Sequence, residues 1–373
     1  MKNLIDNVSN EMNGKMIEPK KRKKKKLFNI MGITLLTIVV LFGSLFLYVS
    51  YNPGIIVGGI QKLLYGNSPI NSFEPLQEPI ETTKENGVYY VSDLKYADVY
   101  PNSFLDISYP NEDKTIDRPT LIYFHGGGYF AGSKSMGDPL AANNDSNYLY
   151  DKLVLEGYNL VNVDYALVPD HHFPVPVIQM NQAINYLVDH AEEFGLNMHN
   201  VVIMGGSAGA IMTAQYGAIL SNSDYAKAFN FAESPKLTTD DVKALVVDDA
   251  PLDIPSFDNF SIKVLIGNYL DDSVFFNNKE IANQYNAINY INSDYPATFL
   301  TAGTDDGFPK DMQHMSDKLT EAGVDNLYFY PDINKYGKTK HGYMSNLKND
   351  PEAAKDSYEA MVEFLNEHTN NKK

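Results

Sequence analysis

The sequence predicts an α/β fold in which a mostly parallel sheet is covered by helices on both faces and is preceded by one N-terminal transmembrane helix. Short apolar runs alternate with helix-compatible segments from residue 120 onward, which is typical of strand–helix–strand units. One apolar run ends in a Gly-x-Ser-x-Gly turn at 205–209, and another is followed by consecutive glycines at 126–128. Near the N-terminus, residues 27–51 carry no charge and are rich in Leu, Ile, Val and Phe.

Composition limits the class of protein. The 373 residues suffice for one large or two ordinary domains, and a hydrophobic content of 44% can form a sizeable core. The absence of cysteine excludes disulfides, thiolate chemistry and cysteine-based zinc sites. Nine of the 30 basic and three of the 47 acidic residues precede residue 27, which leaves 21 basic and 44 acidic residues in the rest of the chain. Such an acidic body argues against sequence-independent binding of nucleic acid.

The N-terminal segment has the features of a membrane anchor. Residues 1–26 end in a run of Lys and Arg, and the apolar run 27–51 is long enough to cross a bilayer core of about 30 Å as a helix. A basic cluster on this side predicts a cytoplasmic N-terminus and a body outside the membrane. The run is long for a signal peptide and no A-x-A cleavage site follows it, so we expect an uncleaved anchor. A nucleic-acid or nuclear-import role for the basic run is the weaker interpretation beside an apolar span.

The remaining chain divides into a membrane-proximal spacer, 52–86, and a body, 87–373. The spacer contains prolines among scattered apolar residues and has room for a short helix near 60–65. The body opens with an expected antiparallel pair of strands and continues with further strands, at 88–96, 103–109, 120–124, 159–165, 201–204, 242–247, 297–300 and 326–330. The expected helices are 147–156, 177–194, 210–220, 310–322 and 351–368, with 256–295 as a helical excursion over the sheet.

The turn at 205–209 indicates a nucleophilic serine. The apolar run 201–204 predicts a buried strand, and helix-compatible residues follow the turn. A serine on a strained strand-to-helix turn projects its hydroxyl clear of the sheet, and Gly205 and Gly209 allow the chain to bend so tightly. Taken alone, the pentapeptide also fits an ordinary helix start with Ser207 as its capping residue.

A serine hydroxyl is a poor nucleophile at pH 7, so it needs a base, an acid that orients the base, and donors for the oxyanion. The run His125-Gly126-Gly127-Gly128-Tyr129 follows an apolar strand, and glycines there let backbone N–H groups approach a substrate oxygen. A phosphate loop of the Walker type would need Gly-Lys-Ser/Thr, whereas Lys134 follows Ser133. The sequence therefore favours an oxyanion loop at residues 125–129.

The base and the acid should lie at the carboxyl edge of the sheet, where ligands bind in open α/β folds. Of the eight histidines, His341 is the best candidate because it falls between the last expected strand and the last helix. Asp305 directly follows the strand 297–300 and is the first choice for the acid, with Asp306 as its rival; either could also be a turn-forming aspartate. The order serine, acid, histidine is that of α/β-hydrolases.

Metal-dependent hydrolysis has little support in the sequence. No His-Glu-x-x-His motif occurs, and the adjacent His171 and His172 form a poor metal pair. We therefore expect no metal and no cofactor.

The chain resembles the hormone-sensitive-lipase-like esterases and lipases, a group of α/β-hydrolases, from about Tyr96 to the C-terminal helix. The resemblance rests on HGGGY at 125–129, DYALVPDHHFP at 164–174, GGSAG at 205–209, TAGTDD at 301–306 and HGY at 341–343. It departs from the family pattern at Ala166, Val168 and Asp170, where Arg, Ala and Glu are usual, and at Gly206, where Asp or Thr is common.

The resemblance implies roles for particular residues. Ser207 would be the nucleophile, His341 the base and Asp305 the orienting acid. The N–H groups of Gly127, Gly128 and Ala208 would receive the oxyanion. Family members often use their N-terminal segment as a cap over the pocket, whereas here that segment is partly a membrane tether.

Together these features predict a membrane-anchored carboxylic-ester hydrolase that acts outside the membrane through an acyl-enzyme. A serine peptidase of the same fold is a second hypothesis, although no propeller repeat accompanies the catalytic body. A third is a catalytically inactive surface-binding module, although such modules typically lose the serine or histidine. Glycan esters, lipid esters and small esters all remain candidate substrates, and the sequence leaves the oligomeric state open.

Overall fold

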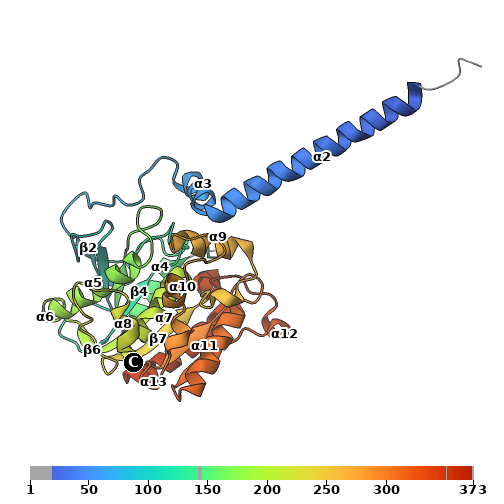
Figure 1. Ribbon diagram of the computed structural model, residues 1–373. Coiled ribbons are helices and arrows are strands. Elements are labelled where there is room, and N and C mark those ends of the chain that lie inside the picture. The colour runs from blue at the N-terminus through green and yellow to red at the C-terminus, as the bar shows by residue number, and fades with distance from the viewer. Residues whose placement is uncertain (1–18, 142–144, 350, 372–373) are drawn as a thin grey trace, which may run out of the picture. The chain divides into compact units, whose positions relative to one another are not determined.

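The computed structural model describes residues 19–141, 145–349 and 351–371. The chain divides after Tyr51 into two compact units. The first contains helix α2 (Pro19–Tyr51), the long blue helix of Figure 1. Residues 1–18 of the expected basic tail lie outside the described residues.

Within the described part of the chain, one helical stretch is long and apolar enough to span a membrane, as judged by length and composition. It runs from Lys26 to Tyr51 and has 26 residues. At 1.5 Å per residue such a helix is about 39 Å long, which exceeds a bilayer core of about 30 Å. Signal sequences near an N-terminus share this length and apolar composition, so the helix is a candidate membrane span.

The second unit is built on a nine-stranded sheet with the order β1-β2-β3-β5-β4-β6-β7-β8-β9. The strands from β5 to β9 in this order run parallel, whereas β1, β2 and β3 pair antiparallel with their neighbours. The strands are β1 (Glu81–Thr83), β2 (Tyr89–Lys95), β3 (Phe104–Tyr109), β4 (Pro119–Phe124), β5 (Asn159–Val163), β6 (Asn197–Gly206), β7 (Val242–Asp248), β8 (Thr298–Thr301) and β9 (Asn326–Phe329). The predicted fold class, a mostly parallel sheet of the α/β-hydrolase type, is confirmed.

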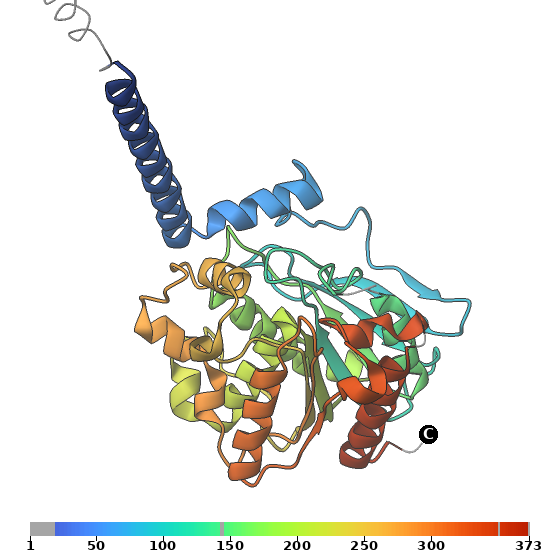
Figure 2. The same ribbon diagram turned by 90° about the vertical axis from the view of Figure 1, so that its right-hand side faces the viewer.

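Helices cover both faces of this sheet (Figures 1 and 2). The α-helices of the second unit are α3 (Gly54–Tyr65), α4 (Ser146–Leu155), α5 (Val175–Asp189), α6 (Ala191–Phe194), α7 (Ala208–Ser221), α8 (Ser223–Lys227), α9 (Phe260–Tyr269), α10 (Lys279–Tyr285), α11 (Pro309–Glu321), α12 (Ile333–Tyr336) and α13 (Glu352–Thr369). Short 3-10 helices are η1 (Ile254–Ser256), η2 (Ala287–Tyr290) and η3 (Tyr343–Asn349).

Side chains of the central strands alternate between two cores, as the pleat of a strand requires. In β4, Leu121 and Tyr123 join a core shared with α4, η3 and α13. Ile122 and Phe124 join a larger core shared with α5, α7 and α11. Both faces are therefore apolar, which explains why the central strands read as continuous apolar runs in the sequence.

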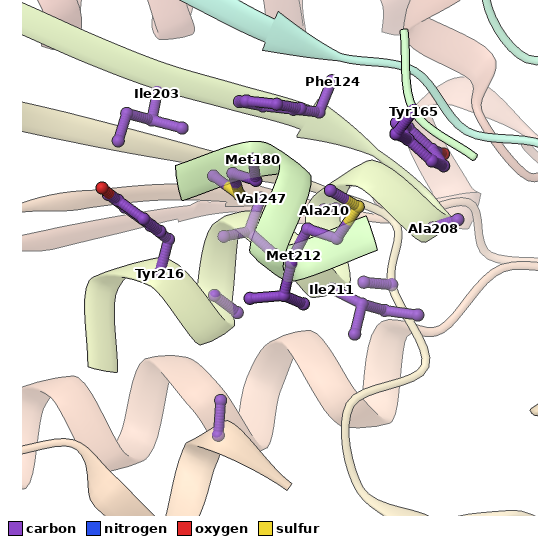
Figure 3. Packing of buried hydrophobic residues seen from close by; sticks show 14 of the residues in the cluster. Phe124, Tyr165, Met180, Ile203, Ala208, Ala210, Ile211, Met212, Tyr216 and Val247 are labelled. Atoms are coloured by element: carbon purple, nitrogen blue, oxygen red, sulfur yellow. The ribbon is translucent and has the colours of Figure 1, made fainter. Parts of the chain in front are cut away.

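Helix α7 is embedded in the larger core. Figure 3 shows its residues Ile211 and Met212 packed with the strand residues Phe124 and Val247. Burial of an aliphatic side chain contributes about 1.5–3 kcal/mol, so this packing holds the helix firmly against the sheet. The residue directly before α7 is Ser207, and its backbone is fixed by the same packing.

The expected spacer 52–86 is folded onto the second unit. It contains α3, which is longer than the helix expected near 60–65, and the edge strand β1, which pairs with β2. The region 256–295 is helical, as predicted, and contains α9 and α10.

Candidate active site

The tight turn between β6 and α7 places Ser207 at the carboxyl edge of the sheet. Ser207 has a φ of 52° and a ψ of −113°, a conformation that non-glycine residues rarely adopt. A Cβ atom at Gly205 would overlap the backbone of Gly209, and a Cβ at Gly209 would overlap the carbonyl oxygen of Phe124. Both glycines of the Gly-x-Ser-x-Gly turn are thus required by close backbone approach, and the strained turn directs the serine away from the sheet.

His341 faces this serine from the loop between α12 and η3. Its Nε2 atom lies 3.0 Å from the Oγ atom of Ser207, within hydrogen-bond distance. The ring of Phe308 packs edge-on against the imidazole, with 5.4 Å between ring centroids. The backbone N–H of His341 donates to the carboxylate of Asp306, which fixes the loop. The structure therefore brings together the two residues that the sequence singled out as nucleophile and base.

The carboxylate at the other side of the imidazole belongs to Asp249, which is not among the residues predicted for the site. Its Oδ2 atom lies 3.0 Å from the Nδ1 atom of His341, an ion-pair distance without the alignment of a regular hydrogen bond. Asp249 is fully buried and accepts backbone hydrogen bonds from Gly303, Phe308 and Gly342 at 2.8–2.9 Å. Charge-assisted bonds of this kind stabilise the ionised carboxylate.

Asp305 and Asp306, predicted as first choice and rival for the acid, have other partners. Asp305 forms ion pairs of 2.6 Å with Lys338 and Lys340, and these hydrogen bonds lower its pKa to about 2. Asp306 binds the backbone of His341 instead of its ring. The prediction of Asp305 at the imidazole is wrong because two surface lysines hold its carboxylate, and the three backbone donors are arranged around Asp249.

A signal for Asp249 was present in the sequence. Asp248 and Asp249 directly follow the expected strand 242–247, just as Asp305 and Asp306 follow 297–300. Because β7 and β8 are parallel neighbours, both pairs reach the same edge of the sheet. The positive φ of Asp249, 61°, turns its side chain toward the histidine loop, and no sequence pattern encodes that turn.

The electrostatics of the site favour a protonated imidazole. Burial alone disfavours the charged ring, but attraction to Asp249, with further contributions from Asp138 and Asp248, outweighs it and raises the pKa of His341 to about 9. The site thus provides strong stabilisation for the imidazolium that forms when the histidine accepts a proton.

The glycine loop after β4 lies beside the serine. Gly127 and Gly128 have φ values of 104° and 59°, and a Cβ atom at Gly127 would overlap the carbonyl of Ala131. Gly128 and Ala208 line the same pocket as Ser207. The N–H of Gly127 instead donates to the carboxylate of Asp138. Of the three residues predicted as oxyanion donors, Gly128 and Ala208 therefore line the pocket beside Ser207, and Gly127 does not.

The glycine loop is braced by a buried polar network. His125 stacks on the ring of Tyr165, with 4.2 Å between centroids, and the Tyr165 hydroxyl donates to the His125 carbonyl at 2.6 Å. Farther along, the Nζ atom of Lys134 lies 2.6 Å from Asp93 and 2.8 Å from Asp106. Buried ion pairs position a backbone well, since breaking one leaves an uncompensated charge.

A mostly apolar cavity of about 240 Å³ opens on Ser207. Its walls are the glycine loop, the start of α7 and one face of α9, and they include Gly128, Tyr129, Leu140, Ile211, Leu265 and Ile266. A second cavity of about 290 Å³ adjoins it and shares Ile262, Asp306 and Phe308. Among the described residues, no group of three or more His, Asp or Glu side chains is placed to bind a metal ion.

Comparison with known proteins identifies the family of the chain. The BD-FAE family model matches residues 105–320, and the chain belongs to this family. The sheet and the serine turn make the chain an α/β-hydrolase of the esterase and lipase type, which confirms the family predicted from the sequence.

Curated relatives share parts of this region. Lipase 2 of a Moraxella species is 25% identical over 104 residues, which cover 28% of this chain and 22% of the relative. The acetyl esterase of Salmonella paratyphi B is 30% identical over 97 residues, which cover 26% of this chain and 27% of the relative. The chain thus spans about a quarter of the length of these relatives. Esterase B of Lactobacillus rhamnosis, inhibited by a tributyrin phosphonate, has the same fold, with a TM-score of 0.65, 17% identity, and 85% of this chain and 93% of that one covered.

Proposed function

We propose that the protein is a membrane-anchored serine carboxylic-ester hydrolase whose catalytic unit lies outside the membrane. The observation that carries this proposal is the line of contacts from Asp249 through His341 to Ser207 at the mouth of an apolar cavity. A nucleophile, a base within hydrogen-bond distance and a carboxylate behind the base are the parts that acyl transfer requires.

In the proposed reaction, Nε2 of His341 accepts the proton of the Ser207 hydroxyl while Oγ attacks the ester carbonyl carbon. The oxyanion that forms is received by the N–H groups of Gly128 and Ala208, since the N–H of Gly127 donates to Asp138. The imidazolium then returns its proton to the leaving alcohol, and the acyl group remains on Oγ. The same imidazole then removes a proton from a water molecule, whose oxygen attacks the acyl carbon. As the C–Oγ bond breaks, the imidazolium returns this proton to Oγ and the carboxylic acid is released.

Asp249 has a positioning role in this scheme. It stabilises the imidazolium by charge and holds the ring in the tautomer whose Nε2 accepts a proton. Its three backbone partners, Gly303, Phe308 and Gly342, keep the carboxylate in place throughout the reaction.

The proposed substrates are esters of short acids. A cavity of about 240 Å³ with apolar walls holds a small acyl group rather than a long fatty chain. The relative named acetyl esterase is consistent with this size class. A panel of nitrophenyl esters graded by acyl length measures the limit directly.

Anchoring by α2 is supported by the length and apolar character of Lys26–Tyr51 and by the basic run that precedes it. This arrangement predicts a cytoplasmic N-terminus. Protease treatment of intact cells should degrade residues 52–373, and protection of this part of the chain would refute the topology.

Replacement of the serine tests the proposed chemistry. Ser207→Ala should abolish hydrolysis of nitrophenyl acetate and labelling by a fluorophosphonate, while circular dichroism stays unchanged. Ser223→Ala, at an exposed serine in α8, is the matched control and should keep full activity. Activity of Ser207→Ala equal to that of the wild type would overturn the assignment.

A further inference from the structure

Helix α3 packs one face against the rest of the second unit and exposes the opposite face. Val57 and Gln61 point inward, and Val57 belongs to the larger core. The outer face carries four large apolar side chains with exposed fractions of 38–86%, namely Ile55, Ile60, Leu63 and Leu64. Figure 2 shows α3, in light blue, at the outside of the second unit.

The rotation of α3 about its axis is fixed by buried hydrogen bonds. The amide of Gln61 donates to the carbonyl oxygens of Phe130 and Val168, at 2.8 Å and 2.9 Å. The hydroxyl of Tyr65 accepts from the N–H of Gly132 at 3.1 Å. Turning the helix to hide Leu63 would break these bonds and leave backbone groups without their partners, which is unfavourable.

The outer face of α3 is unusual for a surface in water. Single exposed leucines are common, but here four large apolar residues lie within three helical turns and are interrupted by one charged residue, Lys62. Leu63 is 86% exposed in the described part of the chain. Such a combination of an apolar face and a basic residue is typical of helices that lie in a membrane interface.

The position of α3 in the chain favours the bilayer as the partner of this face. Gly54, the first residue of α3, is three residues after Tyr51, where the candidate span ends. Three residues reach at most about 11 Å even when fully extended. If α2 crosses the membrane, the start of α3 must therefore lie within the headgroup region or at its border.

We propose that α3 is an interfacial helix, which lies on the outer surface of the bilayer with Ile60, Leu63 and Leu64 among the lipid chains. Lys62 extends its ammonium group toward anionic headgroups. Because the opposite face of α3 is bonded to the loop 126–132, the glycine loop of the candidate active site is held close to the membrane surface. This inference rests on the proposed anchoring by α2.

The absence of native cysteine permits a direct test in the full chain. The variants Leu63→Cys, Ile60→Cys, Phe42→Cys and Leu155→Cys are each labelled with an environment-sensitive fluorophore and reconstituted in vesicles of phosphatidylcholine and phosphatidylglycerol. Lipids with spin labels on their acyl chains serve as quenchers. Phe42 reports on the candidate span, and Leu155 is an exposed residue at the end of α4, which leads to the amino edge of the sheet, away from α3.

We expect quenching at positions 60 and 63 to be several-fold stronger than at position 155 and weaker than or equal to that at position 42. Quenching at position 42 with none above the position-155 level at 60 and 63 would overturn the interfacial role of α3 and leave the anchor intact. Absence of quenching at position 42 would instead refute the anchoring itself. Hydrolysis of nitrophenyl acetate by the labelled proteins shows that each has folded.

Discussion

The Oδ2 atom of Asp249 lies 3.0 Å from the Nδ1 atom of His341, although the chain between them contains α9, α10, β8, α11, β9 and α12. The carboxylate belongs to the residue directly after β7 and the imidazole to the loop after α12. Strands β7 and β8 are adjacent and parallel, so residues from both strand ends converge on the histidine. Of the carboxylates at this edge, Asp249 faces the imidazole ring, whereas Asp305 is paired with Lys338 and Lys340.

We predict that Asp249→Asn lowers kcat by roughly 10³–10⁴-fold, because the imidazole loses both its charge partner and the control of its tautomer. Asp305→Asn is the matched variant. It removes ion pairs to two exposed lysines, whose contribution to stability is small because water and salt screen them. Its kcat should stay within about threefold of the wild type.

Steady-state kinetics with a nitrophenyl ester compare the two variants, and thermal denaturation confirms that each is folded. A greater loss of kcat in Asp305→Asn than in Asp249→Asn would contradict the assignment of the acid to Asp249.

The raised pKa of His341 predicts the pH dependence of activity. The base must be neutral to accept a proton, so kcat/KM should increase with pH up to about 9, where the imidazolium loses its proton. In Asp249→Asn the attraction that raises this pKa is gone, and the midpoint of the acidic limb should move to lower pH. Initial rates from pH 5 to 10, corrected with Ser207→Ala for alkaline hydrolysis, provide the measurement. A wild-type midpoint near 6.5, the usual histidine value, would contradict the electrostatic argument.

The same shift affects stability, and its sign follows from linkage. A histidine whose pKa is higher in the folded state stabilises that state while it is protonated. The contribution of His341 should be fully present below about pH 6.5 and be lost as the pH rises through about 9. Denaturant unfolding measures this contribution as the difference in free energy of unfolding between the wild type and His341→Ala. This difference should shrink as the pH rises from about 6.5 to about 9. A difference that grows with pH would show that the sign is wrong.

Two glycines of the serine turn, Gly209 and Gly206, should differ in their tolerance of a side chain. A Cβ atom at Gly209 would overlap the carbonyl oxygen of Phe124, whereas a Cβ at Gly206 would lie 3.2 Å from the hydroxyl of Tyr123, which can shift slightly. We expect Gly209→Ala to lower the free energy of unfolding by about 1–3 kcal/mol and to impair catalysis, because the overlap displaces the glycine loop after β4. Gly206→Ala should be close to neutral. Urea unfolding and esterase assays distinguish them, and equal stability of the two variants would contradict the packing argument.

The order of strands and helices and the serine turn could be predicted from the sequence because they depend on local patterns. Apolar runs identify the strands, and the spacing of Gly205 and Gly209 reflects a contact within the turn itself. Asp249 was missed because its selection depends on a backbone turn and on three donors from distant loops. The helix expected near 60–65 is present as the longer α3, but its contacts with the rest of the second unit could not be predicted. Gln61 finds its partners, Phe130 and Val168, only after the sheet has formed.

Through this contact, α3 is hydrogen-bonded to the loops that follow β4 and β5. Gln61→Ala would leave the carbonyl oxygens of Phe130 and Val168 without their donor, so the free energy of unfolding should fall by about 1–3 kcal/mol. Since Phe130 belongs to the loop that carries Gly127 and Gly128, kcat should fall more than the affinity for substrate changes.

Lys62→Ala, one residue farther along α3 at an exposed position, is the control and should keep both stability and kcat in detergent solution. Thermal unfolding and full kinetics of the detergent-solubilised chain provide both readouts. If Gln61→Ala behaves like Lys62→Ala in both, α3 does not support the oxyanion loop, and the region 52–86 acts as a spacer after all. If only stability falls, the helix braces the fold without positioning the catalytic groups, because a displaced Gly128 N–H would lower kcat.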